Sequence, residues 1–432
     1  MANLPRYENY KDSGVEWLGE IPKSWTITRM SNFGFFSKGQ GISKAQVSES
    51  GFPALLYGDI YTKYEIKTDQ LVTRIPASIA NNSEKIYRSN LCFTASGETI
   101  EDIGKCVLYD SDKVGYAGGD IIIFRQTKQH SLYLSYLFNS YFFREQKAKL
   151  AKGEIIVHIY SSKLKTIKFC LPPIAEQKRI AEFLDRKCAE IDEAITKKER
   201  LIELLEEQKN ILINQAVTKG LNPDAPTKDS GIDWLGDIPQ HWQLKRIKNI
   251  FKLIIEQAPD NNDMELLSVY SDIGVKPRKE LEERGNKAST TDGYWIVKKG
   301  DFIINKLLAW MGALGLSNYD GVTSPAYDIL RPRVCLSGEY FNYVLRMPTC
   351  TAELKRHSRG IMEMRLRLYF DKFGALYFPF PPETEQKEIA EFLETKLSEC
   401  DYAKAKNLEQ IKKLTELKQI LIAEAVTGKI KV

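Results

Sequence analysis

The chain has 432 residues, 43% of them hydrophobic and 28% charged, and its formal net charge is +5. This length exceeds one ordinary hydrophobic core and predicts two to four structural units. No run of about 18 apolar residues occurs, which excludes a membrane-spanning helix, and the first residues lack the apolar stretch of a signal peptide, so we expect a cytoplasmic protein.

The first element in chain order is a short phrase at positions 11–25, which occurs again at positions 228–242. The two copies are 217 positions apart, and ten of their fifteen residues are identical. A second block, at 172–220, returns 209 positions later at 381–429 with about half of its residues matched. The chain is therefore an internal duplication.

A long insert follows each copy of the first phrase, at 26–171 and at 243–380, and the two inserts resemble each other only faintly. The repeated parts thus form a common frame whose one function is carried out twice. Each insert carries out its own version of a second function. We expect each insert to contain a twisted sheet with short helices, one of them around Leu132–Leu137. The predicted domains are 1–171, 172–220, 221–380 and 381–432.

The repeated block predicts a long helix. From Ala175 to Thr218 it contains no glycine or proline, two prolines precede it, and Gly220 follows it, as expected for the start and the end of a helix. Apolar residues recur at spacings of four and three, which is typical of a coiled coil. A helix of about 46 residues would be about 69 Å long.

A helix of this length needs a partner for its apolar stripe, and we expect that partner to be its own copy. Equivalent units joined head to tail usually pack about a pseudo-two-fold axis, which makes the helices antiparallel. The alternative is that each stripe packs on its own globular neighbour. Lys198 and Asn407 hold equivalent positions in the stripe and predict a polar layer. A closed ring of this kind also predicts that the termini lie close together, with Thr427 near Lys11.

The basic excess lies outside the helices. Each helix has nine basic and ten acidic residues, so the rest of the chain carries +7. Basic and polar residues of the inserts are therefore candidate DNA contacts, because Arg and Lys suit guanine edges and phosphates while Gln suits adenine. For any one of them, a solvated surface charge is the more ordinary interpretation. In the first insert the candidates are Lys38, Gln40, Lys44, Arg74, Lys85 and Arg88. In the second they are Lys276, Arg278, Lys279, Lys287, Arg356, Arg359, Arg365 and Arg367, and we expect a strand directly after them at Leu368–Phe370.

Two divergent inserts that alternate with two repeated long helices resemble the layout of type I restriction-modification specificity subunits. The phrases Lys11–Gly19 and Leu171–Ile180, with their copies, resemble the frame of that family, and Gly51–Pro53 leading to Tyr57–Ile60 looks like its recognition domain. The resemblance covers nearly the whole chain. It implies an α/β protein in which two target-recognition domains with twisted sheets are separated by two long helices, paired as an antiparallel coiled coil with pseudo-two-fold symmetry.

The resemblance also implies a function. Each recognition domain would read one half of a bipartite double-stranded DNA target, while the helices set the spacing and dock two modification subunits. Those subunits would bind S-adenosylmethionine and methylate adenine, and separate restriction subunits would use ATP and Mg to translocate and cut DNA. No cofactor and no catalytic residue are expected in this chain.

Two other functions are a stand-alone methyltransferase or endonuclease and a structural coiled-coil adaptor. The enzyme is disfavoured because the sequence has no Gly-rich cofactor loop, no Asn/Asp-Pro-Pro-aromatic motif and no P-loop. The adaptor is disfavoured because a scaffold gives no reason for two divergent basic inserts. The four histidines and seven cysteines lack ligand spacing, so we expect no metal and reduced, mostly buried thiols. Packing is the expected role of the tryptophans in the repeated phrase, which are Trp17, Trp25, Trp234 and Trp242.

Overall fold

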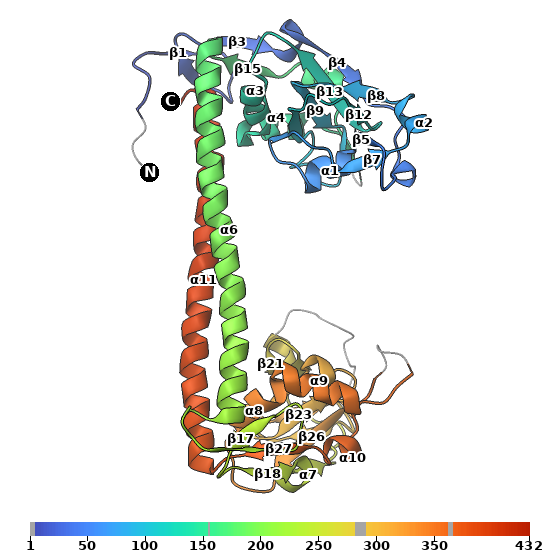
Figure 1. The fold of residues 1–432 in the computed structure, drawn as a ribbon, viewed down its shortest axis with the longest axis vertical. Helices are drawn as coiled ribbons and strands as arrows, with labels where there is room; N and C mark the ends of the chain where they lie inside the picture. Colours follow the sequence, from blue (N-terminus) through green and yellow to red (C-terminus); the bar gives the residue numbers. More distant parts are fainter. Residues whose placement is uncertain (1–4, 154–155, 281–290, 362–365) are drawn as a thin grey trace. The chain divides into compact units, whose positions relative to one another are not determined.

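The computed structural model describes residues 5–153, 156–280, 291–361 and 366–432. Contacts divide the chain into two compact units, one of Met1–Lys198 with Glu409–Val432 and one of Glu199–Leu408. Each unit holds one insert and half of each long helix (Figure 1). The sequence predicted the helices as domains of their own, whereas the contacts assign the two halves of each helix to different units.

The repeated phrase folds as a hairpin. In the first unit, β1 (Tyr10–Asp12) pairs antiparallel with β2 (Glu20–Pro22). Between these strands the backbone passes through Gly14 and Gly19, at φ values of +64° and +59°. Glycine adopts this left-handed conformation without steric cost, which explains its place in the phrase. Trp25, at the end of the phrase, is fully buried, so its predicted packing role is confirmed.

The first insert folds as two sheets with short helices. Its larger sheet has the strand order β4 (Gly34–Lys38), β13 (Ile121–Gln126), β9 (Asn90–Thr94), β11 (Cys106–Tyr109) and β6 (Lys67–Thr68). Its smaller sheet has the order β7 (Thr73–Ile75), β5 (Phe52–Leu55), β12 (Gly115–Ala117) and β8 (Glu84–Ile86). The helices are α1 (Tyr57–Thr62), α2 (Ala77–Ala80), α3 (Ser131–Asn139), α4 (Tyr141–Leu150) and α5 (Ser161–Leu164). Helix α3 confirms the short helix predicted at 132–137.

The second unit repeats this plan with shorter sheets. The phrase again forms a hairpin, of β16 (Thr227–Asp229) and β17 (Asp237–Pro239). The main sheet has the order β19 (Phe251–Ile254), β26 (Tyr327–Pro332), β23 (Phe302–Asn305) and β24 (Leu314–Leu316). Two further pairs are β20 (Leu267–Tyr270) with β21 (Gly274–Pro277) and β22 (Trp295–Val297) with β25 (Gly321–Thr323). The helices are α7 (Ile247–Ile250), α8 (Gly338–Arg346), α9 (Pro348–His357) and α10 (Phe370–Phe373).

One further strand pair in each unit leads from the insert into a long helix. In the first unit β3 (Thr26–Arg29) pairs with β15 (Lys168–Leu171), which precedes α6 (Ile174–Lys219). In the second unit β18 (Gln243–Arg246) pairs with β27 (Tyr377–Phe380), which precedes α11 (Glu383–Thr427). Helix α6 is followed directly by a glycine, Gly220, with φ of +73°, as the sequence predicted.

The two long helices run antiparallel within each unit, as the sequence predicted. In the first unit Asp192 of α6 pairs with Lys418 of α11 at 2.7 Å. In the second unit Lys209 of α6 pairs with Asp401 of α11, also at 2.7 Å. The two aspartates are 209 positions apart in the sequence, and so are the two lysines. The same ion pair therefore occurs twice with the helices exchanged, as a pseudo-two-fold requires.

The predicted apolar stripe is most deeply buried toward the ends of the helices. Ala181, Leu184 and Cys188 are buried in the first unit and Ala216 in the second, whereas the stripe positions nearer the middle of α6 are only half-buried. The predicted polar residue Lys198 lies there. It is half-buried and donates to the side-chain oxygen of Gln410.

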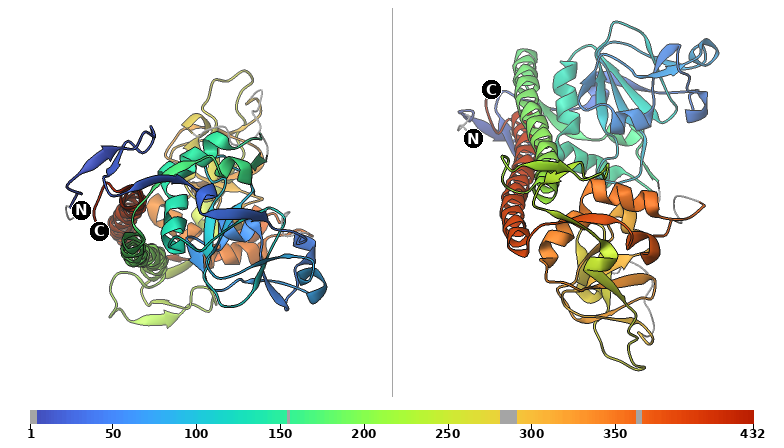
Figure 2. Two further views of the ribbon diagram at one scale, coloured as in Figure 1. Left: turned by 90° about the horizontal axis from the view of Figure 1, so that it is seen from above. Right: turned by 60° about the horizontal axis from the view of Figure 1, so that its bottom comes forward.

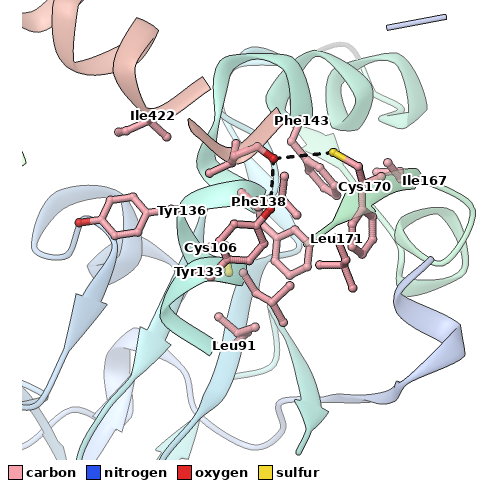
Figure 3. Packing of buried hydrophobic residues seen from close by; sticks show 14 of the residues in the cluster. Leu91, Cys106, Tyr133, Tyr136, Phe138, Phe143, Ile167, Cys170, Leu171 and Ile422 are labelled. Atoms are coloured by element: carbon pink, nitrogen blue, oxygen red, sulfur yellow. Dashed lines mark hydrogen bonds between the residues drawn. The ribbon is translucent and has the colours of Figure 1, made fainter. Parts of the chain in front are cut away.

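Figure 3 shows how the end of a helix enters the core of the first unit. Aromatic rings of the insert pack together, with ring centroids 5.4 Å apart for Phe93 and Phe138. The hydroxyl of Tyr133 in α3 donates to the carbonyl of Val426 in α11 at 3.1 Å (Figure 3). Cys170 Sγ lies 3.7 Å from the same oxygen. The core of the unit thus includes the last turns of α11.

A buried glutamine near the start of each long helix ties the helix to the insert of its unit. Gln177 accepts a hydrogen bond from the backbone N–H of His130, the N-cap of α3, at 3.0 Å. Gln386, 209 positions later, accepts one from the N–H of Ser337, the N-cap of α8, at 2.9 Å. The frame therefore holds both inserts by the same contact.

The two ends of the described chain lie together in the first unit (Figure 2). The backbone N–H of Lys431 donates to the carbonyl of Pro5 at 2.7 Å. The hydroxyl of Tyr10 donates to the carbonyl of Gly428 at 3.1 Å. The prediction that the termini lie close together is confirmed.

Two further expectations concern single residues. All seven cysteines are free thiols, and six of them are buried while Cys335 is exposed. The strand expected at Leu368–Phe370 is absent. Tyr369 is instead the N-cap of α10, which begins at Phe370. Apolar and aromatic neighbours suit a strand and a buried short helix equally, so their pattern did not distinguish the two.

Candidate nucleic-acid interface

One end of the larger sheet in the first unit gathers polar side chains. Strand β9 ends there at Thr94, which lies opposite Ile121 of β13, and the next residue of β13 lies opposite Lys38 of β4. Thr94 is buried, and its hydroxyl lies 2.7 Å from the hydroxyl of Tyr61. Neighbouring strands are about 4.8 Å apart, which places Lys38 about 10 Å from Thr94 at the same sheet end.

A short antiparallel ribbon lies at this sheet end. The N–H of Lys152 donates to the carbonyl of His158 at 3.0 Å, and the reverse bond is 2.7 Å. We call residues 152–153 and 156–158 the first ribbon. Its return strand, β14 (Val157–His158), pairs with β10 (Ser96–Gly97), which directly follows β9. The imidazole Nδ1 of His158 also lies 3.0 Å from the hydroxyl oxygen of Ser96.

The side chains of the first ribbon alternate between core and solvent. Val157 is buried, whereas Lys152 and Ile156 are exposed and His158 is half-buried. Tyr160, two residues beyond the ribbon, is 56% exposed. An alternation of this kind anchors a ribbon by one face and presents the other face to a partner.

The second unit has the same ribbon at the equivalent place. The N–H of Arg359 donates to the carbonyl of Arg367 at 2.9 Å, and the reverse bond is 2.8 Å. We call residues 359–361 and 366–367 the second ribbon. The next residue, Leu368, donates its N–H to the carbonyl of Lys306, which directly follows β23, at 2.8 Å. In the first unit Ile159 makes the matching bond to the carbonyl of Ala95 at 2.9 Å.

More positive charge surrounds the second ribbon than the first. Arg359 and Arg367 are both exposed, and Arg359 has a long 3.7 Å contact with Asp371. Helix α9 leads into the ribbon, and the ammonium of Lys355 in its last turn lies 4.8 Å from the centre of the Trp310 ring. Tyr369 follows the ribbon and is 42% exposed.

The structure brings only some of the predicted first-insert residues to the ribbon end of the sheet. Lys38 and Gln40 lie there, and both are exposed; the N–H of Gln40 donates to the carbonyl of Ala117 at 3.0 Å. Lys44 is exposed in a 3-10 helix (Lys44–Gln46), and Lys85 is exposed in β8 of the smaller sheet.

Two predicted arginines of the first insert are engaged within the protein. Arg74 is half-buried and donates from Nη1 to the carbonyl of Leu71 at 2.5 Å. Arg88 precedes the start of β9, at the other end of the strand from the ribbon, and it pairs with Asp110 at 3.0 Å and with Asp112 at 2.9 Å. These two carboxylates compensate its charge before any phosphate is present.

The predicted residues of the second insert fall into three places. Arg359 and Arg367 form the second ribbon, and Arg356 lies beside it but pairs with Glu353 at 2.8 Å. Arg278 lies in a 3-10 helix (Arg278–Glu280), and its backbone N–H donates to the carbonyl of Leu266 at 2.8 Å. Lys287 and Arg365 lie outside the described residues.

The third group comprises Lys276 and Lys279, which make contacts within the protein. Lys279 pairs with Glu265. Lys276 donates to the hydroxyl of Tyr319 at 3.2 Å and lines a polar cavity of about 420 Å³ beside α8. Arg346 and Glu394 line the same cavity.

The sequence reasoning missed the first ribbon and the aromatic residues that flank both ribbons. A signal was present: Lys152 and Arg359 are 207 positions apart, whereas His158 and Arg367, like Tyr160 and Tyr369, are 209 positions apart. The offset of the frame therefore continues into the ends of the inserts. Because His158 and Arg367 differ in type, the correspondence was hidden until the backbone pairing showed it.

Within the described residues no group of His, Cys, Asp or Glu side chains is placed to hold a metal ion. No helix among them is long and apolar enough to cross a membrane.

A family model described as "Type I restriction modification DNA specificity domain" matches the chain twice, over residues 22–206 and 239–413. The chain belongs to this specificity-subunit family. Each match spans one insert and the first part of the helix that follows it, so the duplicated unit of the chain is the domain that defines the specificity subunits.

Curated relatives of this family are similar over part of their length. The MjaVIII specificity subunit of Methanocaldococcus jannaschii is 25% identical over 249 residues, which cover 56% of this chain and 52% of the relative. The EcoBI specificity subunit of Escherichia coli is 24% identical over 297 residues, or 64% of this chain and 61% of the relative. The chain thus spans between half and two thirds of these relatives.

Two solved structures share the fold. A chain from a study of complex assembly and conformational transition of the type I R-M system has a TM-score of 0.72 at 16% identity, covering 95% of this chain and 99% of that chain. The HsdS subunit from Thermoanaerobacter tengcongensis has a TM-score of 0.57 at 17% identity, covering 95% and 98%. Two sheet domains separated by long helices are therefore the fold of this specificity subunit.

Proposed function

We propose that this chain is the DNA-reading, non-catalytic specificity subunit of a type I restriction-modification enzyme. Each recognition domain reads one half of a bipartite target, and the two long helices set the gap between the halves. The observation that carries this proposal is the pair of ribbons, which have the same backbone hydrogen bonds but different side chains. One scaffold used twice with different side chains suits two readers of two different short sequences.

The chemistry of modification and cleavage belongs, in this proposal, to partner subunits. Two modification subunits would bind S-adenosylmethionine and methylate adenine, and restriction subunits would use ATP and Mg. The sequence of this chain has neither the Asn/Asp-Pro-Pro-aromatic motif that holds a target amine nor a P-loop. Side chains that suit DNA contact are exposed instead, among them Lys38, Lys152, Arg359 and Arg367.

The long helices offer a surface for the modification subunits. In the second unit, Leu201, Leu204 and Leu408 of the paired helices are 43%, 43% and 50% exposed, and Tyr402 is 71% exposed. Apolar side chains exposed on the outer faces of a helix pair suit the addition of further helices from a partner.

An exchange of inserts tests the division of labour. Cells that carry this chain with its modification subunit are subjected to methylome sequencing, which gives both half-sites and the gap. Replacing residues 243–380 with the corresponding insert of another specificity subunit should change one half-site and leave the other half-site and the gap unchanged. A change in both half-sites, or methylation by the purified chain alone, would contradict the proposal.

A further inference from the structure

We infer that the two ribbons are the equivalent base-reading elements of the two recognition domains, and that the tyrosine after each ribbon contacts the DNA backbone. This inference rests on the proposed function and deepens it. It assigns base readout to Lys152 and His158 in the first unit and to Arg359 and Arg367 in the second. It assigns a shared phosphate contact to Tyr160 and Tyr369.

The described part of each ribbon is a two-stranded backbone pairing, which suits groove reading. A two-stranded β-ribbon fits the major groove of B-DNA, and each ribbon here is closed by a reciprocal pair of backbone hydrogen bonds between 2.7 and 3.0 Å. Each ribbon is also anchored to the end of a central strand, by the bonds to Ala95 and Lys306. The side chains at the paired positions are thus presented by a backbone whose own donors are already satisfied.

The positions that differ between the units are suited to base edges. Arg359 and Arg367 can each donate two parallel hydrogen bonds to guanine, whereas Lys152 donates from a single point and His158 can donate or accept. The hydroxyl of Ser96 lies 3.0 Å from His158 Nδ1 and so orients its imidazole, which leaves Nε2 as its second polar atom. Two half-sites read by such different side chains would have different sequences.

A tyrosine follows the ribbon in both units, and it is suited to contact the phosphate backbone, which is the same in every DNA sequence. A tyrosine hydroxyl is a frequent donor to phosphate oxygens, and such contacts position a protein without reading sequence. Tyr160 and Tyr369 are both the N-cap residues of short helices, α5 and α10, and both rings are about half exposed. Identity at this position and divergence on the ribbons are what a division between phosphate contact and base contact predicts.

Charges elsewhere on the sheets give matched controls. Lys113 lies beyond the end of β11 in the first unit, and Lys299 lies before the start of β23 in the second. Both are exposed, and both lie at the opposite end of their sheet from the ribbon. Replacing either lysine by Ala removes one positive charge but no ribbon contact.

The test uses the complete complex of this chain with its modification subunit. Methylome sequencing first defines the target, and duplexes with single base-pair changes in either half-site then serve as probes for fluorescence anisotropy. We expect Lys152→Ala with His158→Ala to reduce discrimination in one half-site by about 5- to 150-fold, with the other half-site unaffected. Arg359→Ala with Arg367→Ala should do the same for the other half-site only. Lys113→Ala and Lys299→Ala should leave discrimination in both half-sites unchanged.

The tyrosines require a different readout. Tyr160→Phe and Tyr369→Phe should each weaken binding to all duplexes, by roughly three- to tenfold, without changing discrimination at any base pair. In every variant, discrimination in the unaltered half-site shows that the complex is folded.

The outcomes separate this inference from the proposed function. If the unaltered complex does not discriminate between duplexes, the proposed function is wrong. If it discriminates but the ribbon variants weaken all duplexes equally, alter the other half-site or have no effect, the ribbons do not read bases and the inference is overturned.

Discussion

The hydroxyl of Tyr133 donates a hydrogen bond of 3.1 Å to the carbonyl of Val426, 293 positions further along the chain. Tyr340 and Val217 repeat this contact at 3.1 Å in the second unit. Each carbonyl lies in the last turn of a long helix, where the helix itself supplies no further N–H donors. A helix of each insert thus completes the end of one long helix, which links the insert to the frame.

We expect Tyr133→Phe and Tyr340→Phe to lower the free energy of unfolding by about 1–3 kcal/mol each, because each removes the hydroxyl that donates to a buried carbonyl. The loss should be smaller for Tyr133→Phe, since the thiol of Cys170 remains 3.7 Å from the carbonyl of Val426. Urea unfolding followed by circular dichroism measures this change. Tyr87→Phe is the matched control, since Tyr87 is 47% exposed, and it should change stability by less than about 0.5 kcal/mol. Equal stability of all three variants would show that the two hydroxyls do not stabilise the helix ends.

A buried lysine should make the stability of the first unit depend on pH. Lys147 is fully buried and donates to the carbonyls of Gly104 and Phe138, at 2.5 and 2.9 Å. Burial lowers its pKa from 10.5 to about 7. Between these values the folded protein holds the neutral amine, while the unfolded chain binds a proton. Its contribution to stability therefore rises as pH increases from about 7 to about 10.5.

The variant Lys147→Met isolates this effect from other titrating groups. From pH 7 to pH 9 the unfolding free energy of the natural chain should rise relative to that of the variant, as measured by urea unfolding. Leu354, 207 positions later, is buried in α9 as Lys147 is in α4, and Leu354→Met should give a difference that is independent of pH. A constant difference for Lys147→Met would show that the amine is charged in the folded state.

The polar residues near the middle of the helices are expected to lower the stability of the helix pair while fixing its register. Lys198 and Asn407 are both half-buried, and Asn407 donates to its own helix at the carbonyl of Ala403, 2.9 Å away. Replacing both by Leu should raise the melting temperature, because half-buried polar groups are desolvated at a cost, while loosening the register of the pair. Unchanged or lower thermal stability would show that the polar contacts stabilise the pair as they stand.

Lengthening the helices should change the gap in the target and leave its bases unchanged. Four residues inserted into each helix, next to Lys198 and next to Asn407, add about 6 Å to the rod. This corresponds to one to two base pairs at about 3.4 Å each. Methylome sequencing should then show both original half-sites with a longer gap. Altered half-site bases would contradict a spacer role.

Features that depend on local periodicity were determined by the sequence alone. The duplication at offsets of 217 and 209 positions is visible without a structure. The long helices follow from the spacing of their apolar residues, and α6 ends at Lys219, next to the glycine that marks its stop. The antiparallel pairing also followed, because a stripe repeated in two equivalent helices has its best partner in its own copy. The ion pair of Glu353 with Arg356 also depends on local periodicity, because the two residues are three positions apart in α9.

Only the tertiary structure decided which polar residues are available to a partner. The charge of Arg88 is compensated by Asp110 and Asp112. These carboxylates lie close to Arg88 because the register of β11 with β9 places the turn after β11 beside it. The ribbons depend on register in the same way: Lys152 meets His158, and Arg359 meets Arg367, through backbone atoms that carry no side-chain signal. A helix repeats its contacts at a fixed spacing, whereas a partner across strands is set by the packing of the whole sheet. For this reason the sequence revealed the two long helices and the two inserts, but not the surface with which the inserts would read DNA.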